Sequence, residues 1–301
     1  MRSWYDSHVS TPLREAASVI LLRRGPKGGA PFEVFLLRRR KGASFMASAF
    51  VFPGGGTEGG EDARTCAARE LFEEAGVLLV REIDRGFEDD TLNTTLADDS
   101  PAFSIASLRK KVLAGANATE LLATYELRWW TDLLTPWSHW ITPSIEPKRF
   151  SARFFVCELP GGQKPSFDGD ETVEDTWVSP ADAIARASEL CLPPPQLRTM
   201  YELASLSSIQ DVLAAAKVRA EEPHPILPRL RTMSPGDQGP TLLLPWDPDY
   251  AELGTGESAP LTYTPSWATG PSRFVLDGAL APESGVANVR AWKHIVAPSA
   301  G

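Results

Sequence analysis

The chain has 301 residues, of which 43% are hydrophobic and 23% charged, so it can bury a sizeable core and is not disordered as a whole. Thirty basic residues against thirty-nine acidic ones give a net charge of −9, which argues against a general nucleic-acid binder. No apolar run approaches the roughly 18 residues of a membrane-spanning helix. Three widely spaced cysteines argue against a disulfide framework or a zinc site and, with no secretory pattern at the N-terminus, predict a cytoplasmic protein.

The first third of the chain alternates strand patterns with glycine-rich turns. Residues 16–22 are apolar and β-branched and predict a buried strand, and residues 32–37 predict a second strand that forms a hairpin with the first. Glycine and proline at 25–29 mark the turn between them. Residues 61–75 carry alanine or leucine at every fourth position, which predicts a helix, and Gly76 follows where a C-cap glycine is expected.

The middle of the chain predicts a helical insertion followed by strands. Residues 82–100 are acidic and polar and indicate a loop, whereas residues 104–134 indicate helix. Strands are predicted at 150–159 and 174–178, and a helix is predicted at 180–190.

The last third changes in composition. Prolines at 193–195 break the chain before a predicted helix over 196–220. Residues 223–301 hold twelve of the 26 prolines, which excludes long helices. Apolar pieces such as 241–244 and 289–296 persist there, so we predict an extended tail that is docked on the body rather than free.

The segment from Gly55 to Val77 places three glutamates on one helical arc. Each residue of a helix turns about 100°, so Glu73 lies about 60° to one side of Glu70 and Glu74 about 40° to the other. Carboxylates this close repel one another and require a counter-charge. Because Mg²⁺ and Mn²⁺ prefer oxygen ligands, the segment predicts a divalent-metal site.

The glycines that precede this helix suit the same site. Gly54, Gly55 and Gly56 permit a close backbone approach, and a carbonyl oxygen of this loop can serve as a further metal ligand. Backbone N–H groups that enter the helix can face a phosphate. A P-loop is excluded, because no Gly-Lys-Ser/Thr sequence follows at the required offset.

The complete spacing of this segment resembles the Nudix box, which combines a glycine, a glutamate and the motif R-E-U-x-E-E-x-G-U, with U aliphatic. Every fixed position is matched, by Gly55, Glu61, Arg69, Glu70, Leu71, Glu73, Glu74, Gly76 and Val77. The chain is therefore identified as a member of the Nudix hydrolase family. Weaker similarities extend over most of the chain, at 16–22, 45–55, 140–142, 149–155, 192–196 and 242–245, and resemble the longer acyl-coenzyme A diphosphatase subfamily.

The resemblance implies an α/β fold, namely a Nudix-type α/β/α sandwich with a mixed central sheet, a helical insertion and an extended C-terminal tail. The expected organisation is a Nudix hydrolase domain at 12–192, with the insertion at about 82–140. A C-terminal helix at 193–222 and a docked proline-rich tail at 223–301 are expected to follow.

The resemblance also implies roles for single residues of the box. Three glutamates and one backbone carbonyl are implied to hold Mg²⁺ or Mn²⁺: Glu70, Glu73, Glu74 and Gly55. Glu61 and Arg69 are implied to form a structural ion pair that orients the box.

The general base is implied to be a glutamate from a loop before a later strand. Glu171 lies six residues before Trp177, which is the spacing of the resembling subfamily, so Glu171 is the first choice. Glu174 and Glu73 remain the alternatives. Three arginines are candidates for contact with substrate phosphates: Arg39, Arg149 and Arg153.

The implied reaction is the metal-assisted hydrolysis of a diphosphate linkage in a nucleoside-diphosphate-linked small molecule. Coenzyme A or acyl-coenzyme A is the leading substrate. Ser44 and Ser48 stand where the coenzyme A signature has an arginine and a glycine, so a generalist diphosphatase for nucleotide sugars, dinucleotides or oxidised nucleotides remains open.

A Nudix-fold binding or regulatory module is the alternative of another class, although a pure binder has no need of intact carboxylates. No nucleic-acid or membrane partner is expected, and a homo-oligomer remains open.

Overall fold

The computed structural model describes residues 12–83, 104–231, 239–253, 264–276 and 292–295. The helices are α1 (Ala63–Ala75), α2 (Ile105–Leu113), α3 (Ala118–Ala123), α4 (Pro180–Ala185), α5 (Pro194–Leu203) and α6 (Ile209–Glu221), with 3-10 turns η2 (Thr131–Leu133) and η3 (Tyr250–Leu253). The strands are β1 (Leu13–Arg24), β2 (Phe32–Arg39), β3 (Phe50–Val51), β4 (Gly54–Gly56), β5 (Val80–Glu82), β6 (Leu127–Trp129), β7 (Thr135–Ile141), β8 (Arg149–Glu158), β9 (Thr172–Val178), β10 (Pro225–Ile226), β11 (Arg229–Arg231), β12 (Thr241–Leu243), β13 (Arg273–Leu276) and β14 (Trp292–Ile295).

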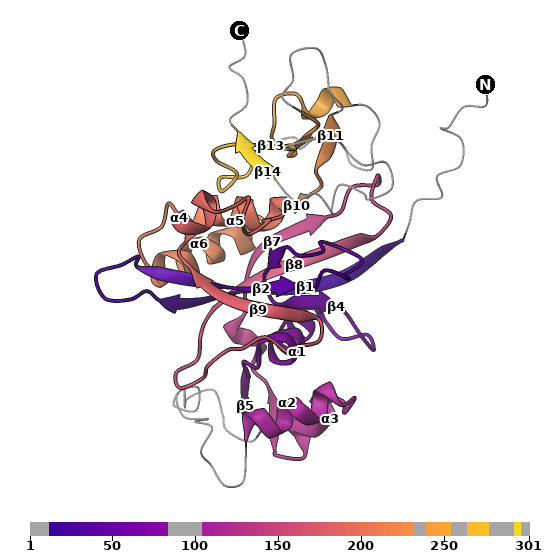
Figure 1. Ribbon diagram of the computed structural model, residues 1–301, viewed down its shortest axis with the longest axis vertical. Helices are drawn as coiled ribbons and strands as arrows, with labels where there is room; N and C mark the ends of the chain where they lie inside the picture. Colours follow the sequence, from indigo (N-terminus) through magenta and orange to yellow (C-terminus); the bar gives the residue numbers. More distant parts are fainter. Residues whose placement is uncertain (1–11, 84–103, 232–238, 254–263, 277–291, 296–301) are drawn as a thin grey trace, which may run out of the picture.

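A mixed sheet forms the centre of the molecule (Figure 1). Its strands follow the order β10-β7-β8-β1-β2-β3, with β4 paired to β1 and β9 paired to β2. β1 pairs in parallel with β8 from Leu13 to Leu22, and it pairs in antiparallel fashion with β2 and β4 along its other edge. The predicted strands at 16–22, 32–37 and 150–159 thus lie next to one another at the centre of the sheet.

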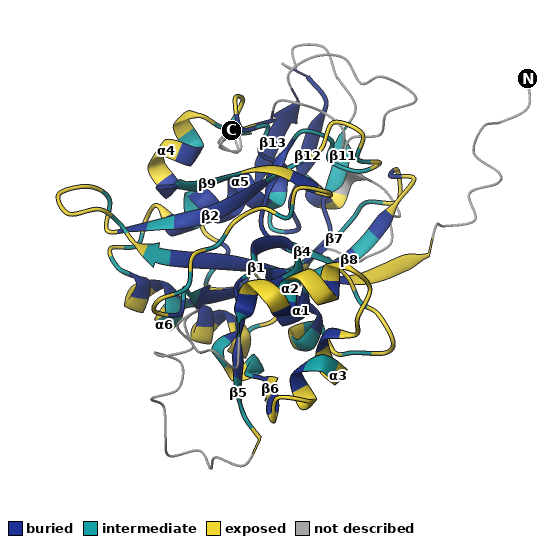
Figure 2. Ribbon diagram, turned by 60° about the horizontal axis from the view of Figure 1, so that its bottom comes forward, coloured by how far each residue is buried: buried dark blue, intermediate teal, exposed yellow. Residues whose placement is uncertain are grey.

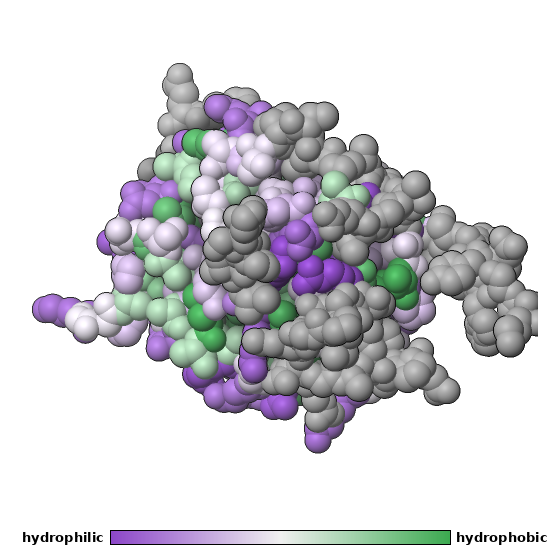
Figure 3. Space-filling model, turned by 90° about the horizontal axis from the view of Figure 1, so that it is seen from above, coloured by the Kyte–Doolittle hydropathy of each residue, from purple (hydrophilic) through white to green (hydrophobic). Residues whose placement is uncertain are grey.

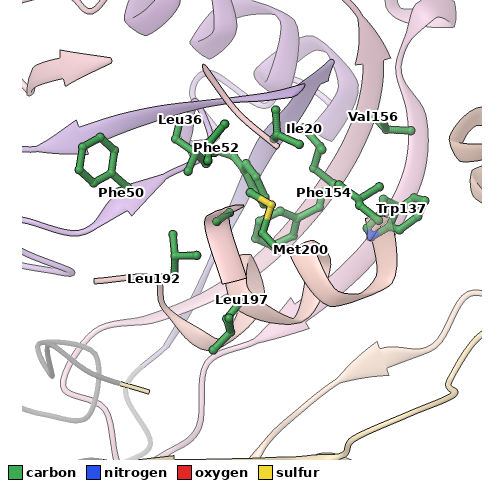
Figure 4. Packing of buried hydrophobic residues seen from close by; sticks show 14 of the residues in the cluster. Ile20, Leu36, Phe50, Phe52, Trp137, Phe154, Val156, Leu192, Leu197 and Met200 are labelled. Carbon is green, nitrogen blue, oxygen red and sulfur yellow. The ribbon is translucent and has the colours of Figure 1, made fainter. Parts of the chain in front are cut away.

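Helices cover both faces of this sheet. On one face, Phe72 of α1 shares a buried hydrophobic cluster with Val19 of β1. On the other face, Met200 of α5 shares a second cluster with Ile20 and Phe154, and Figure 4 shows these side chains together. Figure 2 shows the central strands largely buried, while α2 and α3 turn exposed faces outward. The prediction of an α/β/α sandwich with a mixed sheet is confirmed.

Helix α1, which carries the three glutamates, is fixed at both ends. The Asp62 side chain caps its start by accepting hydrogen bonds from two backbone N–H groups of the first turn, at 2.9 Å each. Gly76 ends it in the left-handed conformation, with φ 70°. Arg109 of α2 then donates to the carbonyl oxygens of Glu73 at 3.0 Å and Glu74 at 2.7 Å, the acceptors that a helix end leaves open.

The insertion departs from the predicted helix over 104–134. It holds two short helices, α2 and α3, followed by β6, which pairs with β5. Leu127 and Trp129 are buried, whereas Arg128 between them is exposed, and this alternation is typical of a strand. The helix prediction was therefore wrong at its C-terminal end. The acidic loop predicted at 82–100 lies almost entirely outside the described residues.

The region predicted as one C-terminal helix, 193–222, contains two helices. The side chain of Ser208 accepts a hydrogen bond from the N–H of Asp211 at 3.1 Å and caps a new helix, α6. The prediction of one helix over 196–220 was wrong because it overlooked this N-cap serine. The helix predicted at 180–190 is α4, which ends at Ala185.

The described residues after position 223 form strands and contact the body. β10 pairs with β7, and β11, β12, β13 and β14 form a separate antiparallel sheet. Leu242, Phe274 and Trp292 of that sheet belong to the same buried cluster as Met200 of α5.

One buried arginine links α5 to this segment. Arg198 is 2% exposed and donates to the carbonyl oxygens of Thr269 and Pro271 at 2.5 Å each. It also contacts the carboxylate of Glu202 at 2.8 Å. A buried guanidinium with three acceptors is satisfied in place. The Pro271 carbonyl also accepts from His294, and Glu202 also accepts from Trp137, so the Thr269 carbonyl depends most on Arg198.

We expect Arg198→Met to lower the free energy of unfolding by about 3 kcal/mol, because it leaves the Thr269 carbonyl and one oxygen of the Glu202 carboxylate without this donor. Chemical denaturation measures this loss, and limited proteolysis should show faster cleavage within 264–276. The matched control is Arg186→Met, which removes an exposed ion pair with Glu189 and should change stability by less than about 1 kcal/mol. Equal stability of the two variants would refute the assignment.

Exposed hydrophobic side chains are dispersed over the described surface. In Figure 3, which views the molecule from above, hydrophobic residues lie in small patches among hydrophilic ones. Within the described ranges, the large exposed ones are Leu13, Ile83, Leu113, Tyr125, Ile145, Phe167, Val173 and Val218. None of the described helices is both long enough and apolar enough to cross a membrane.

Candidate active site

The glycines of β4 bring the backbone into close contact with α1. β4 pairs with Ala16 to Ser18 of β1, and the carbonyl of Pro53 accepts a hydrogen bond from the N–H of Val19 at 2.8 Å. This pairing sets Gly55 so close to Glu70 that a Cβ atom at Gly55 would lie 2.6 Å from the carboxylate oxygens. Glycine is therefore required at this position between β1 and α1.

Glu74 is attached to the same strand. Its side chain is 6% exposed, and its Oε2 accepts a hydrogen bond from the N–H of Gly54 at 2.8 Å. The carbonyl oxygen of Gly55 lies 3.7 Å from the Sγ of Cys66, which leaves that oxygen a second lone pair. Two carboxylates and one backbone oxygen thus gather where β4 meets α1.

Arg69 connects the other acidic residues of the box. Its side chain is buried and contacts Glu61 at 2.7 Å, Glu70 at 2.9 Å and Glu73 at 3.0 Å. It also donates to the carbonyl oxygen of Gly56 at 2.9 Å. The structure therefore brings Glu61 and Arg69 together and ties them to β4.

The three glutamates that the resemblance implies for the metal have different partners in this structure. Glu70 and Glu73 both accept hydrogen bonds from Arg69, Glu74 accepts one from the backbone of β4, and Glu70 also lies against β4. Accordingly, no group of three acidic, histidine or cysteine side chains among the described residues is arranged to hold a metal ion. Glu70 and Glu74 with backbone oxygens still form a donor set that suits Mg²⁺, which combines one or two carboxylates with water and phosphate oxygens.

The carboxylates of this site titrate far from their ordinary range. Burial raises the pKa of Glu70 to about 7, against the opposing charge of Arg69. Burial raises the pKa of Glu74 to about 8, and the negative charge of Glu70 is the next cause. Burial also raises the pKa of Glu73. The charge of Glu171 adds to the shifts of Glu70 and Glu74, so its carboxylate lies within electrostatic reach of both.

A pocket of about 840 Å³ opens onto these carboxylates. Its wall contains Glu70, Glu74 and Glu171 together with Arg39. A large apolar part of the wall comes from the sheet, from α5 and from the segment after 223: Phe52, Trp140, Phe150, Phe154, Pro194, Leu242 and Trp292. The pocket therefore joins a charged wall to an apolar one.

Glu171 is presented to the pocket by a turn that precedes β9. The carboxylate of Asp168 accepts hydrogen bonds from the N–H groups of Asp170 at 2.5 Å and Glu171 at 2.7 Å. The carbonyl of Glu171 in turn accepts from the N–H of Arg40 at 3.1 Å. The backbone at Glu171 is thus fixed on both sides.

Three of the candidate residues lie outside the described pocket wall. Glu174 lies within β9 and contacts Arg38 at 3.0 Å. Arg149 donates to a backbone carbonyl, and Arg153 pairs with Glu15. The reason is the alternation of β8, because its even-numbered residues line the pocket and the odd-numbered arginines point to the opposite face. Among the three candidate arginines, Arg39 lies in the wall.

Sequence reasoning missed two contributions to this site. Arg109 lies far from the box in sequence, and only the packing of α2 against α1 brings it to the helix end. Leu242 and Trp292 enter the pocket wall through the strands after 223. The apolar character of those segments was visible in the sequence, but their place in the wall was not.

The raised pKa values predict how the metal-free protein responds to pH. Glu70 and Glu74 have an ordinary pKa of 4.5 in the unfolded chain and pKa values of about 7 and about 8 when folded. Between about pH 5 and 8 the folded state retains protons that the unfolded chain has lost. The free energy of unfolding should therefore fall as pH rises, by about 1.4 kcal/mol per pH unit for each group that remains protonated.

Denaturation in a chelator across this pH range measures the slope. Glu74→Gln should make it shallower, and added Mg²⁺ should raise stability most at the alkaline end, where the carboxylates are ionised. The same slope in the wild type and in Glu74→Gln would contradict the assignment.

Known proteins resemble this chain along most of its length. A sequence profile of the NUDT19 Nudix domain matches residues 59–206. A Gallus gallus protein named acyl-coenzyme A diphosphatase NUDT19 is 30% identical over 320 aligned positions, which cover 81% of this chain and 82% of that protein. A Caenorhabditis elegans protein that carries the name nudix hydrolase 7 is 31% identical over 212 positions, which cover 67% of this chain. They cover 63% of the worm protein, which is less than two thirds of its length. The solved structure of a NUDIX hydrolase from Alicyclobacillus acidocaldarius has a TM-score of 0.57 and 25% identity, covering 68% of this chain and 96% of that one.

Proposed function

Because this chain belongs to the Nudix hydrolase family, we propose that it hydrolyses the diphosphate linkage of coenzyme A or acyl-coenzyme A with the help of Mg²⁺ or Mn²⁺. The observation that carries the proposal is the pocket whose wall joins buried carboxylates to apolar and aromatic side chains. Coenzyme A is highly charged at its phosphates and uncharged along its pantetheine arm, so it complements such a wall. The similarity to the chicken protein named acyl-coenzyme A diphosphatase supports the same substrate class.

We assign the divalent cation to Glu70 and Glu74, with the carbonyl oxygen of Gly55 as a further ligand. When bound, the cation supplies neutralisation of the diphosphate charge and acidification of water. Glu73 lines the same pocket and, like Glu70, contacts Arg69, so it is proposed as a further ligand of the cation.

Glu171 is proposed to take the proton from the attacking water. It lines the same pocket as Glu70 and Glu74, on a turn fixed by the Asp168 carboxylate. A general base must lie within reach of the water that it activates. Glu174 lies outside the pocket wall and does not meet this requirement. Arg39 is proposed to bind a substrate phosphate, because it lines the pocket and its Nε is buried without a hydrogen-bond partner.

The substrate assignment is tested with a panel of diphosphates in Mg²⁺ and in Mn²⁺. We expect the purified chain to turn over coenzyme A and acyl-coenzyme A faster than ADP-ribose, a nucleotide sugar, a dinucleotide or an oxidised nucleotide. Mass spectrometry should identify 3′,5′-ADP and a phosphopantetheine product, and a chelator should abolish turnover. Faster hydrolysis of the nucleotide sugar or the dinucleotide would favour a generalist enzyme instead. Glu74→Gln serves as the inactive control.

The general base is tested by the pair Glu171→Gln and Glu174→Gln at saturating metal. Glu171→Gln should lower kcat by about 100-fold or more, leave substrate binding nearly unchanged and remove the acidic limb of the pH–rate profile. Glu174→Gln breaks a surface ion pair with Arg38 and should keep kcat near that of the wild type. A larger loss in Glu174→Gln, or an unchanged profile in Glu171→Gln, would reject Glu171.

A further inference from the structure

The pocket wall divides by charge according to the part of the chain that supplies it. The basic side chains in the wall come from β1, from β2, from α1 and from the turn before β8: Arg14, Arg39, Arg69 and Lys148. The wall residues from α5 and from the described chain after 223 are all uncharged: Pro194, Pro195, Gln196, Pro228, Leu242 and Trp292. The same segments and their neighbours before α5 also supply seven glutamates, so a ligand that spans the pocket meets charged groups from the chain before α5 and a neutral surface from α5 and the segment after 223.

The neutral wall contains one buried polar side chain without a partner. Gln196 is 4% exposed, and its Oε1 makes no hydrogen bond. A buried amide oxygen without a donor is unfavourable, and such groups are rare in native structures, so this oxygen calls for a partner such as a water or a ligand. Gln196 lines the pocket, and because its Oε1 is covered, the terminal amide group has to turn to present that oxygen to a ligand there.

The local sequence explains why the protein itself does not satisfy this amide. Helix α5 begins with Pro194 and Pro195, and Pro193 precedes them at the N-cap. Proline has no N–H, so the first positions of this helix offer no backbone donor to the Gln196 side chain. The neighbouring wall residues Leu242 and Phe154 have no polar side-chain atoms.

Resting on the proposed function, we propose that the wall formed by α5 and the segment after 223 is a subsite for the uncharged pantetheine arm, and that Gln196 hydrogen-bonds an amide of that arm. The arm carries secondary amides, which supply both the donor and the acceptor that a glutamine amide needs. The nucleotide half carries a further phosphate, which requires cations, and the basic residues of the described wall come from segments before α5. Charge complementarity thus sets the direction in which the substrate lies.

The test compares the binding of the two product halves to the full chain without metal. Calorimetry measures the Kd of 4′-phosphopantetheine and of 3′,5′-ADP for the wild type, for Gln196→Met and for Gln210→Met. Gln196→Met keeps the side-chain volume and removes both polar atoms, whereas Gln210 is exposed on α6 and serves as the matched control. Gln196→Met should weaken 4′-phosphopantetheine about tenfold and change 3′,5′-ADP less than about twofold. Gln210→Met should change neither.

Stability and kinetics separate this role from a structural one. Removing an unpartnered buried amide should leave the thermal midpoint of Gln196→Met at or above that of the wild type. The kcat/KM for coenzyme A should fall about tenfold, while that for ADP-ribose, which lacks the arm, should be retained. Gln196→Asn keeps an amide on a shorter stem and should lose less than Gln196→Met.

The other outcomes of these measurements also test the subsite. Weaker 3′,5′-ADP binding with unchanged 4′-phosphopantetheine would reverse the direction of the substrate and overturn the proposal. An equal loss for both halves with a lowered thermal midpoint would show a structural role and would also overturn it. Gln196-dependent binding of 4′-phosphopantetheine by a chain that does not hydrolyse coenzyme A would support the subsite and refute the proposed function. Hydrolysis of coenzyme A that is unaffected in Gln196→Met would support the proposed function and refute the subsite.

Discussion

The contact between Gly55 and Glu70 is the constraint on which the rest of the site depends. A strand with no side chains is hydrogen-bonded to β1, and the carboxylate of Glu70 rests directly on it. Because Gly54 also donates to Glu74, the same strand fixes a second carboxylate. Arg69 completes the arrangement by bonding to Glu70 and to the Gly56 carbonyl. Burial and mutual repulsion at this junction disfavour negative charge on the two carboxylates, and a divalent cation bound there would offset both effects.

The chemical part of the site was visible in the sequence because it is local. The spacing from Gly55 to Val77 lies on one loop and one helix, where angles between side chains follow from helical geometry alone. The ion pair of Glu61 with Arg69 and the cap at Gly76 are also formed by residues that are close together in the sequence. Central strands such as β1 were equally clear, because they are continuous apolar runs.

What the sequence could not provide depends on tertiary contacts. The choice among three arginines turned on which face of β8 borders the pocket, and strand alternation alone does not name that face. The strand β6 was assigned to a helix because a three-residue alternation is too short to be distinguished from helix by its periodicity.

The place of Trp292 in the pocket wall has a consequence for how the enzyme is made. The carboxylates come from the first third of the chain, whereas Trp292 and Leu242 come from its last quarter. Because the chain is synthesised from its N-terminus, contacts between segments so far apart in sequence cannot form until the second segment has been made. During synthesis, the junction of β4 with α1 can form long before the neutral wall exists. The neutral wall, which we assign to one half of the substrate, is therefore the last part of the pocket to be built.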